Sequence, residues 1–249
     1  MAEAIEANGS RVASLCVAVV ALPTLVLGVI GVVTGLVWWG LLLGALLGVA
    51  LILRARRDVE GAVLRAVGAR RADEVGFRRY HNLVEGLCVT SGLPKPSLWI
   101  VDDQAANALA TARTSQQSSV VVTTGLLDHL ARIELEGVVA SLLGQIRSGD
   151  AAAASAVAML VAPLAPLGDT AAAVARRFVD PGRQTRHDVA ACRITRYPPG
   201  MIAALDRLAQ HDTRPQRHPA PLAHLWLIPT EPSTDTPTLD ERIAMLREL

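Results

Sequence analysis

Residues Glu134–Asp150 read ELEGVVASLLGQIRSGD, and the interpretation of the whole chain starts from this stretch. Its apolar side chains recur at intervals of three and four residues, which is the pattern of a helix that buries one face. They are Leu135, Val138, Val139, Leu142, Leu143 and Ile146. The pattern ends at Ser148-Gly149-Asp150. The stretch therefore predicts a helix with one buried side.

Two polar residues interrupt the middle of this helix, Ser141 and Gln145, and because they are four positions apart they share one face. Helical zinc sites of the His-Glu-x-x-His type use the same spacing. In such a site two imidazoles hold the metal, and the Glu accepts a proton from the metal-bound water. In that register this chain has Ser141, Leu142 and Gln145. The alternative is an ordinary amphipathic helix with a chance likeness.

A membrane-spanning portion is expected, because 51% of the 249 residues are hydrophobic. Between Val12 and Leu53 there is no charged residue. That run is about twice the ~20 residues that one crossing needs, and it predicts two transmembrane helices, at Ser14–Val33 and Leu36–Leu53. A buried hairpin in a soluble protein is the alternative. The run is too long for a cleaved signal peptide, which we do not expect.

The charges around this run predict its orientation. Arg54, Arg56 and Arg57 follow the second span directly and, by the positive-inside rule, lie in the cytoplasm. With two crossings the N-terminus lies there as well. We therefore expect a multi-pass protein of the plasma (inner) membrane, with the soluble domain and both termini cytoplasmic.

Charge and cysteine usage exclude two other classes of site. The formal net charge of +1 gives no electrostatic surface for nucleic acid, so no nucleic-acid partner is expected. Cys16, Cys88 and Cys192 are far apart and lack CxxC spacing. Neither a disulfide framework nor a cysteine-based zinc site is expected.

Several segments precede Glu134–Asp150 in a characteristic order. Strand-like sequences occur at Pro96–Val101 and Val120–Thr124, which are rich in branched and aromatic residues. Gly92–Pro96 reads GLPKP, Asn107–Ala112 reads NALATA, and Val121–Leu127 reads VVTTGLL. With ELEGVVASLLGQIRSGD, these segments resemble the membrane zinc metallopeptidases of the HtpX and CAAX-protease type, a gluzincin-like family. That family has Gly-Leu-Pro-x-Pro, Asn-Ala-Phe-Ala-Thr-Gly and Val-x-Val-Thr-x-Gly-Leu-Leu segments ahead of its zinc helix.

The resemblance continues to the end of the chain. Arg183–Thr195 is similar to the family's Arg-Glu-Tyr-x-Ala-Asp helix, whose Glu is the third zinc ligand; Gln184 stands at that position, and Asp188 matches the pattern's Asp. Ser233–Ile243 resembles the closing Ser-Thr-His-Pro-x-x-x-x-Arg-Ile segment, with Asp235 in place of the His. The resemblance implies a mainly helical α+β fold, in which an N-terminal transmembrane helical hairpin precedes a metallopeptidase-like domain with a small β-sheet.

This fold predicts three parts: an N-terminal cytoplasmic segment (residues 1–12), the transmembrane hairpin (13–53) and a cytoplasmic metallopeptidase-like domain (54–249). Ala151–Leu167 is also apolar and long enough to be considered as a transmembrane helix. A single crossing there would separate Gln184 from Glu134–Asp150, and the family needs both on one side. We therefore expect a buried or membrane-grazing helix at Ala151–Leu167.

The catalytic positions implied by the resemblance are degenerate. The zinc ligands would be Ser141, Gln145 and Gln184, and the general base would be Leu142. Hydroxyl and amide oxygens are poor zinc ligands beside imidazole and carboxylate, and leucine cannot accept a proton. We expect no zinc, no other metal or cofactor, and no zinc proteolysis at this site.

Two other chemistries remain as alternatives. A relocated metal site would have to gather histidines that lack helical ligand spacing; we expect these to be surface or capping residues. They are His129, His187, His211, His218 and His224. Ser141 as a nucleophile would need a base and an oxyanion hole, and the chain has no Gly-x-Ser-x-Gly turn.

A peptide-binding edge strand is the element that does not depend on a metal. In the family, the segment matching Asn107–Ala112 resembles an edge strand along which a substrate polypeptide lies. Strand addition requires backbone groups and pockets only. The predicted peptide-binding residues are Asn107, Ala108, Leu109, Ala110 and Thr111; a purely structural edge strand is the alternative.

These inferences predict a catalytically inactive, membrane-anchored metallopeptidase homologue that acts as a protein-binding or scaffolding subunit of a membrane complex. Its expected partners are the lipid bilayer and another membrane protein or complex. The alternative is an active membrane metalloendopeptidase with unconventional metal ligands. A third interpretation, an accessory subunit held through the hairpin, rests on glycines that allow close helix contact. They are Gly31, Gly35, Gly40, Gly44 and Gly48.

Overall fold

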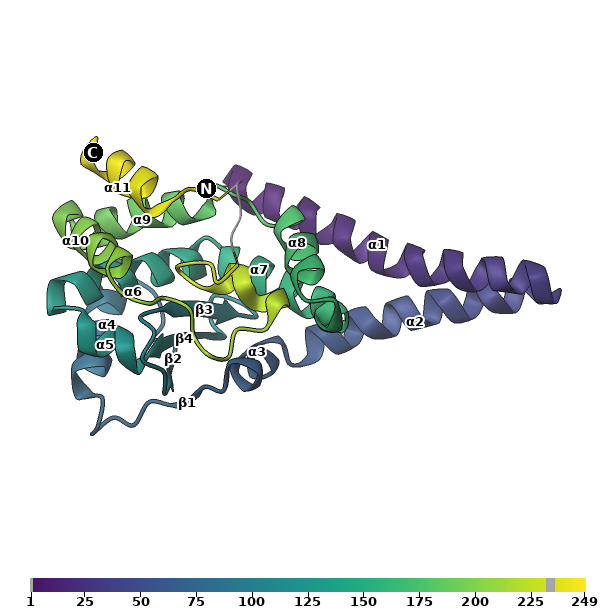
Figure 1. Cartoon of the computed structure of the whole chain (residues 1–249), viewed down its shortest axis with the longest axis horizontal. Coiled ribbons are helices and arrows are strands. Elements are labelled where there is room, and N and C mark those ends of the chain that lie inside the picture. Colours follow the sequence, from purple (N-terminus) through teal and green to yellow (C-terminus); the bar gives the residue numbers. More distant parts are fainter. Residues whose placement is uncertain (1, 232–235) are drawn as a thin grey trace.

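A long helical hairpin projects from a domain of mixed secondary structure (Figure 1). The structure is a computed structural model that describes residues 2–231 and 236–249, with side chains from residue 9 onward. The hairpin consists of α1 (Ala2–Thr34) and α2 (Val37–Arg57). Its turn contains Gly35 with φ of 74°, a left-handed conformation that glycine adopts without steric cost. The predicted fold class, mainly helical α+β with an N-terminal apolar hairpin and a small sheet, is confirmed.

The two helices of the hairpin approach so closely that glycine is required where they touch. A Cβ atom at Gly40 would lie 2.2 Å from the Leu27 carbonyl oxygen. One at Gly44 would lie 2.4 Å from the Thr24 Cα. The predicted close helix contact is therefore real, but it is made within the hairpin. Attachment of the hairpin to another subunit stays a prediction.

The outer surface of the hairpin is apolar and exposed. Trp38 and Trp39, at the start of α2, are 83% and 70% exposed, and both helices present many further exposed aliphatic side chains. Gly9–Thr34 and Val37–Arg57 are both long and apolar enough to cross a membrane. A bilayer is the environment that stabilises such a surface, and the protein is a membrane protein.

The domain begins after Arg57. Its helices are α3 (Val59–Val67), α4 (Arg78–Ser91), α5 (Thr124–His129), α6 (Arg132–Arg147), α7 (Asp150–Val161), α8 (Asp169–Arg177), α9 (Arg183–Thr195), α10 (Pro198–Ala209) and α11 (Leu239–Arg247). Short 3₁₀ helices occur at η1 (Ala162–Leu167) and η2 (Ala220–Leu225). The strands are β1 (Arg70–Arg71), β2 (Ser97–Val101), β3 (Ala108–Ala112) and β4 (Ser118–Thr123).

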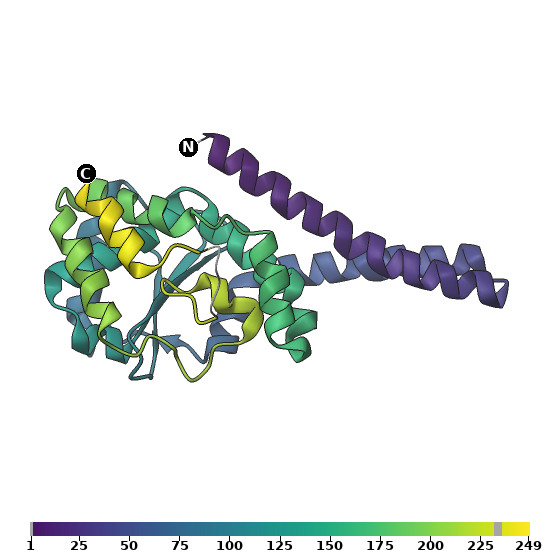
Figure 2. The same ribbon diagram turned by 45° about the horizontal axis from the view of Figure 1, so that its top comes forward.

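Among the described residues, the strands form one mixed sheet in the order β1-β2-β4-β3. The β2–β4 pair is parallel, and the other pairs are antiparallel. Side chains alternate between two cores: Val120 and Val122 pack against α4, α6 and α9, whereas Val121 and Leu109 pack against α3, α7 and η2. Helices thus cover both faces of the sheet (Figure 2), and β3 is an edge strand.

Helix α7 lies inside the domain. The stretch Asp150–Leu167 is apolar enough to be a candidate span, but α7 itself has 12 residues. This is a length of about 18 Å, against the ~30 Å of a hydrocarbon core. One face of α7 packs on β3, where the Ser155 and Thr111 hydroxyls lie 2.9 Å apart. Another face packs on α1 through Val157 and Leu15. The expectation of a buried helix agrees with this packing.

The substitution Gly44→Leu tests the hairpin contact. We expect it to destabilise the protein by about 1–3 kcal/mol, because the new side chain overlaps the backbone of α1. Thermal unfolding of the purified protein in a mild detergent measures the effect. Gly9→Ala is the matched control, because a Cβ atom at Gly9 has no neighbour within 4 Å. An unchanged melting temperature for Gly44→Leu would contradict the packing of α1 on α2.

Candidate functional site

Helices α6 and α9 carry the predicted site residues, and they pack directly against each other. The start of α6 is fixed by Glu134, whose Oε2 accepts a hydrogen bond of 2.7 Å from the Ala131 amide. Gly144 lets the helices come close, since a Cβ atom there would lie 3.2 Å from the Ala190 Cβ. The last turn of α6 therefore faces the first turns of α9, so Gln145 lies beside residues that are far away in the sequence.

The position that the resemblance assigns to the general base is part of the hydrophobic core. Leu142 is fully buried among the apolar residues between the sheet and α6. The neighbouring Ser141 is buried as well, and its hydroxyl makes no hydrogen bond of regular geometry with a described residue. It lies close enough to the Asp188 carboxylate to favour the charged form of that group. In the part of the chain that the structure describes, neither side chain is hydrogen-bonded to a histidine that could act as a base.

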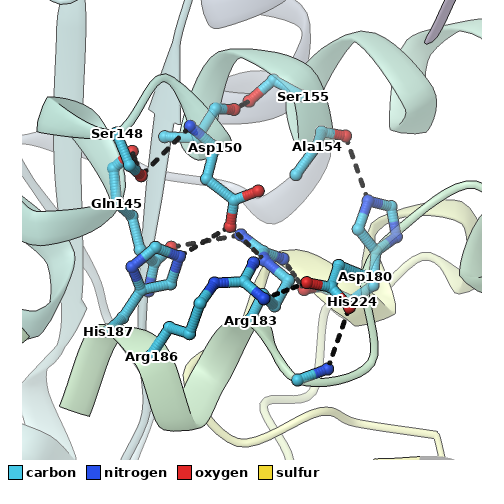
Figure 3. A network of polar contacts seen from close by, with 12 residues as sticks. Gln145, Ser148, Asp150, Ala154, Ser155, Asp180, Arg183, Arg186, His187 and His224 are labelled. Carbon is cyan, nitrogen blue, oxygen red and sulfur yellow. Dashed lines mark hydrogen bonds and ion pairs between the residues drawn. The ribbon is translucent and has the colours of Figure 1, made fainter. Parts of the chain in front are cut away.

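Gln145 is engaged by a buried guanidinium group. Its Oε1 accepts a hydrogen bond of 3.3 Å from Arg183 Nη2. The same guanidinium donates from Nε to Asp150 Oδ2 at 2.8 Å and from Nη1 to the His224 carbonyl oxygen at 2.7 Å (Figure 3). Arg183 is only 4% exposed. A fixed positive charge thus lies within hydrogen-bond distance of an atom that would have to bind a cation.

Asp150 is the centre of this polar network. Its Oδ2 also lies 2.6 Å from His187 Nε2, so a guanidinium and an imidazole share one buried carboxylate (Figure 3). Burial lowers the pKa of His187, and the charge of Asp150 opposes this shift. Partners on several sides are what a buried charge requires. The network joins the end of α6, the start of α7 and the start of α9.

His224 completes the network on the side of η2. Its Nε2 lies 3.0 Å from the Ala154 carbonyl oxygen, and because a carbonyl only accepts, this nitrogen carries the hydrogen. Burial, and next the charge of Arg183, lower the pKa of His224 to about 4. The ring is therefore neutral near pH 7. Its Nδ1 is a bare acceptor without a hydrogen-bond partner in the described part of the chain.

The histidine prediction is therefore only partly right. His129 is exposed, as expected for a surface residue, but His187 and His224 are buried members of one network. In the ranges 9–231 and 236–249 there is no group of three or more His, Cys, Asp or Glu side chains that could hold a metal ion. Arg183 donates hydrogen bonds to Asp150 and to the His224 backbone carbonyl oxygen, and the His187 ring contacts Asp150 directly.

Gln184 faces a different environment from Gln145. It is 6% exposed, and its Oε1 has no hydrogen-bond partner among residues 9–231 and 236–249. It lines a cavity of about 580 Å³ together with Arg183 and His224. The structure thus brings the first turn of α9 to α6, but it is Arg183 that reaches Gln145. A hydroxyl, two amides and an adjacent guanidinium do not fit a zinc ion.

Asp188 has a structural role. Its two carboxylate oxygens accept hydrogen bonds of 2.6 and 2.9 Å from Nε and Nη2 of Arg242, on α11. Arg242 Nη1 also donates to the Leu227 carbonyl oxygen at 3.1 Å. Burial raises the pKa of Asp188, and the guanidinium opposes that shift. The pair ties the C-terminal helix to α9. Asp235, predicted to replace a family histidine, lies outside the described residues.

The edge strand β3 is covered by the chain's own C-terminal part. The Leu227 amide donates to the Ala108 carbonyl oxygen at 2.7 Å, and Leu109 forms an antiparallel bridge with Trp226. The Asn107 side chain binds both backbone groups of Ile228, at 3.2 and 2.8 Å. A peptide could add to this edge only after residues 225–228 leave it. Peptide binding at Asn107, Ala108, Leu109, Ala110 and Thr111 stays a prediction with this condition.

The fold and the site together define a membrane-anchored protein with a metallopeptidase-like domain, in which a serine and two glutamines stand at the positions that the resemblance assigns to metal ligands. The profile of peptidase family M48 matches residues 75–210. The chain belongs to peptidase family M48, and the HtpX-type resemblance is confirmed.

Several curated proteins show the same relationship. A protease HtpX homologue of Tropheryma whipplei (strain TW08/27) is 32% identical over 225 residues, which cover 73% of this chain and 76% of the relative. One from Dictyoglomus turgidum is 30% identical over 74% of each chain. One from Streptococcus thermophilus (strain ATCC BAA-250 / LMG 18311) is 26% identical over 90% of this chain and 93% of its own. No solved structure matches the chain.

Arg242→Leu is expected to lower the free energy of unfolding by about 3–5 kcal/mol, because it leaves the Asp188 carboxylate buried without its partner. The double variant Asp188→Leu/Arg242→Leu removes both charges and should recover much of that loss. Urea unfolding followed by tryptophan fluorescence compares the variants. If Arg242→Leu were as stable as the wild type, the pair would not hold α11 in place.

Stability should fall when the pH is lowered from about 6.5 to about 4. In this range the unfolded chain takes up a proton at His224, whereas the folded chain does not, because its pKa is lowered to about 4. The expected slope is up to about 1.4 kcal/mol per pH unit for one histidine. His187, whose pKa is also lowered, acts in the same direction. Urea unfolding at several pH values should show a shallower slope for His224→Phe and the wild-type slope for the exposed control His129→Ala.

Proposed function

We propose that this protein is a catalytically inactive member of peptidase family M48 that acts as a protein-binding or scaffolding subunit of a membrane complex. The main observation that supports the loss of catalysis is the hydrogen bond of 3.3 Å between Arg183 Nη2 and Gln145 Oε1. A divalent cation on that oxygen would lie roughly 4–5 Å from the guanidinium. The repulsion would be on the order of 7 kcal/mol at an effective dielectric constant of about 20.

Three further features support this part of the proposal. Leu142 offers no group that can accept a proton, and it is fully buried. Ser141 and Gln184 supply neutral oxygens where zinc prefers imidazole or carboxylate. Metal-assisted hydrolysis needs both a lowered pKa of the bound water and a residue that handles its proton. Neither the ligand positions nor the general-base position holds a suitable residue, so a substitution that restored only one of them would not restore the reaction.

The location is also part of the proposal. Arg54, Arg56 and Arg57 form the last turn of α2, at the end of the hairpin that joins the domain. By the positive-inside rule, this end and the domain lie in the cytoplasm. We propose the plasma (inner) membrane as the location, with both termini on the cytoplasmic side.

The binding role rests on a retained frame. The relatives named above are proteases, which must hold a polypeptide before they cleave it. Helix α6, helix α9 and the edge strand β3 are all present here, whereas the reactive groups are not. A domain of this kind is suited to holding a protein without cutting it. We propose another membrane protein as the partner; a peptide could add at β3 only after residues 225–228, which already pair with that edge, leave it.

Metal content and proteolysis of the purified full-length protein test the loss of catalysis. We expect no stoichiometric zinc by elemental analysis and no chelator-sensitive cleavage of unfolded casein. The variants Gln145→Ala and Gln184→Ala should then behave as the wild type does. Stoichiometric zinc together with chelator-sensitive cleavage that either variant abolishes would instead establish an active peptidase with unconventional ligands.

The binding role is tested by purification in a mild detergent, followed by chemical cross-linking and mass spectrometry. We expect a co-purifying membrane protein with cross-links to the domain. A monomer without cross-links to any other protein would contradict the scaffolding role and leave the loss of catalysis unaffected.

A further inference from the structure

The cavity beside Gln184 has a strongly basic lining. Its volume is about 580 Å³, and it opens between the start of α1, the end of α8 and the loops that flank α9 and η2. Four guanidinium groups and two carboxylates line it: Arg11, Arg176, Arg177, Arg183, Asp180 and Glu231. The excess of positive charge favours an anionic ligand.

Both carboxylates of the lining already have cationic partners. Asp180 pairs with Arg186 and lies 3.8 Å from Arg11. Glu231 pairs with Arg214 at 2.9 Å. The three nitrogen atoms of the Arg183 guanidinium likewise already donate hydrogen bonds within the network around Asp150.

Arg176 and Arg177 are different. Neither has an ion pair or a side-chain hydrogen bond with any of the residues that the structure describes. They form the last turn of α8, where the helix dipole favours a cation, which accounts for their position but supplies no counter-ion. Arg176 is half-buried, so its charge is partly removed from water. Two free guanidinium groups on one cavity wall are suited to bind a phosphate.

Two buried acceptors lie behind the same wall. Gln184 Oε1 and His224 Nδ1 have no hydrogen-bond partner within residues 9–231 and 236–249, and each residue is only 6% exposed. A buried acceptor without a donor costs free energy. A ligand hydroxyl could supply the missing donor if the Gln184 amide rotates toward the cavity. The lining therefore favours a ligand that carries both a phosphate and free hydroxyl groups.

The cavity lies close to the point where the exposed apolar surface of α1 begins. Arg11 precedes Val17, a residue of α1 that is 67% exposed, by six positions, or about 9 Å of helix. The headgroup layer of one leaflet is roughly 5–8 Å thick. Helix α8 lies on the side of the domain from which the hairpin projects (Figure 1), and the preceding η1 exposes Leu167. This position favours a ligand from the headgroup layer of the bilayer.

We propose that this cavity binds the headgroup of an anionic phospholipid with free hydroxyl groups, of the phosphatidylglycerol type. The phosphodiester accepts hydrogen bonds from Arg176 and Arg177, and a glycerol hydroxyl donates to Gln184 Oε1 after the amide rotates toward the cavity. The acyl chains remain in the bilayer beside α1. This inference does not depend on the proposed function, because lipid binding here requires neither a partner protein nor the absence of zinc.

Native mass spectrometry of the full chain in a neutral detergent tests the site. Titration with dioleoylphosphatidylglycerol should show one bound lipid at lower concentration than titration with dioleoylphosphatidylcholine. Arg176→Ala/Arg177→Ala should weaken that first binding event at least tenfold. The matched control Arg54→Ala/Arg56→Ala removes the same charge near the same membrane surface, but outside the cavity, and should change it less than twofold. Equal effects of the two variants, or no effect of the first, would overturn the proposal.

Two ligand comparisons refine the assignment. Dioleoylphosphatidylmethanol carries the same charge but no hydroxyl group, and it should bind at least threefold more weakly; equal binding would overturn the role of the hydroxyls. Soluble glycerol 3-phosphate, titrated calorimetrically into the protein in phosphatidylcholine nanodiscs, should show no binding at millimolar concentration. Binding of glycerol 3-phosphate that is lost in Arg176→Ala/Arg177→Ala would overturn the lipid as the source of the phosphate.

Discussion

The buried guanidinium of Arg183 is the constraint on which the arrangement around α6 and α9 depends. An arginine cannot lose its proton in a protein, so a buried one needs an acceptor for each of its donor groups. Arg183 finds them on Gln145, Asp150 and the His224 backbone, which belong to α6, α7 and η2. The α6–α7 junction and η2, which are distant from each other in the sequence, are thereby held around one cation, and their relative positions are set by its planar geometry.

A second buried ion pair starts from the same helix and points elsewhere. Asp188 lies five residues after Arg183 and binds Arg242 of α11. Helix α9 is thus anchored toward its start to the α6–α7 junction and in its middle to the C-terminal helix. In a metallopeptidase, metal–ligand bonds contribute to holding such helices together. In this chain, side-chain ion pairs and the close contact at Gly144 do so.

The features that the sequence predicted well are those with a local periodicity. An uncharged run revealed the hairpin, three-and-four spacing revealed α6, and branched residues revealed β2 and β4. The resemblance placed Gln184 on the correct helix but did not indicate which way its side chain points. The polar network could not be predicted, because Asp150 and Arg183 are 33 residues apart and no spacing rule pairs them.

The prediction that the histidines are surface or capping residues was wrong for His187 and His224, and for the same reason. Whether a histidine is exposed depends on which elements cover it, and this is decided by tertiary packing. His187 occupies a position where the family pattern has alanine. A polar ring at this position was the one local sign in the sequence that the residues around it differ from those of the family. His224 gave no such sign, because its burial comes from α7, through the contact with Ala154.

The self-pairing of β3 has a consequence for how the chain reaches its final state. The segment that closes this edge follows Leu109 by 117 residues, since the bridge joins Leu109 to Trp226. During synthesis the sheet therefore keeps an open edge until most of the polypeptide has left the ribosome. Such long-range pairings form slowly, and open edges invite association with other chains.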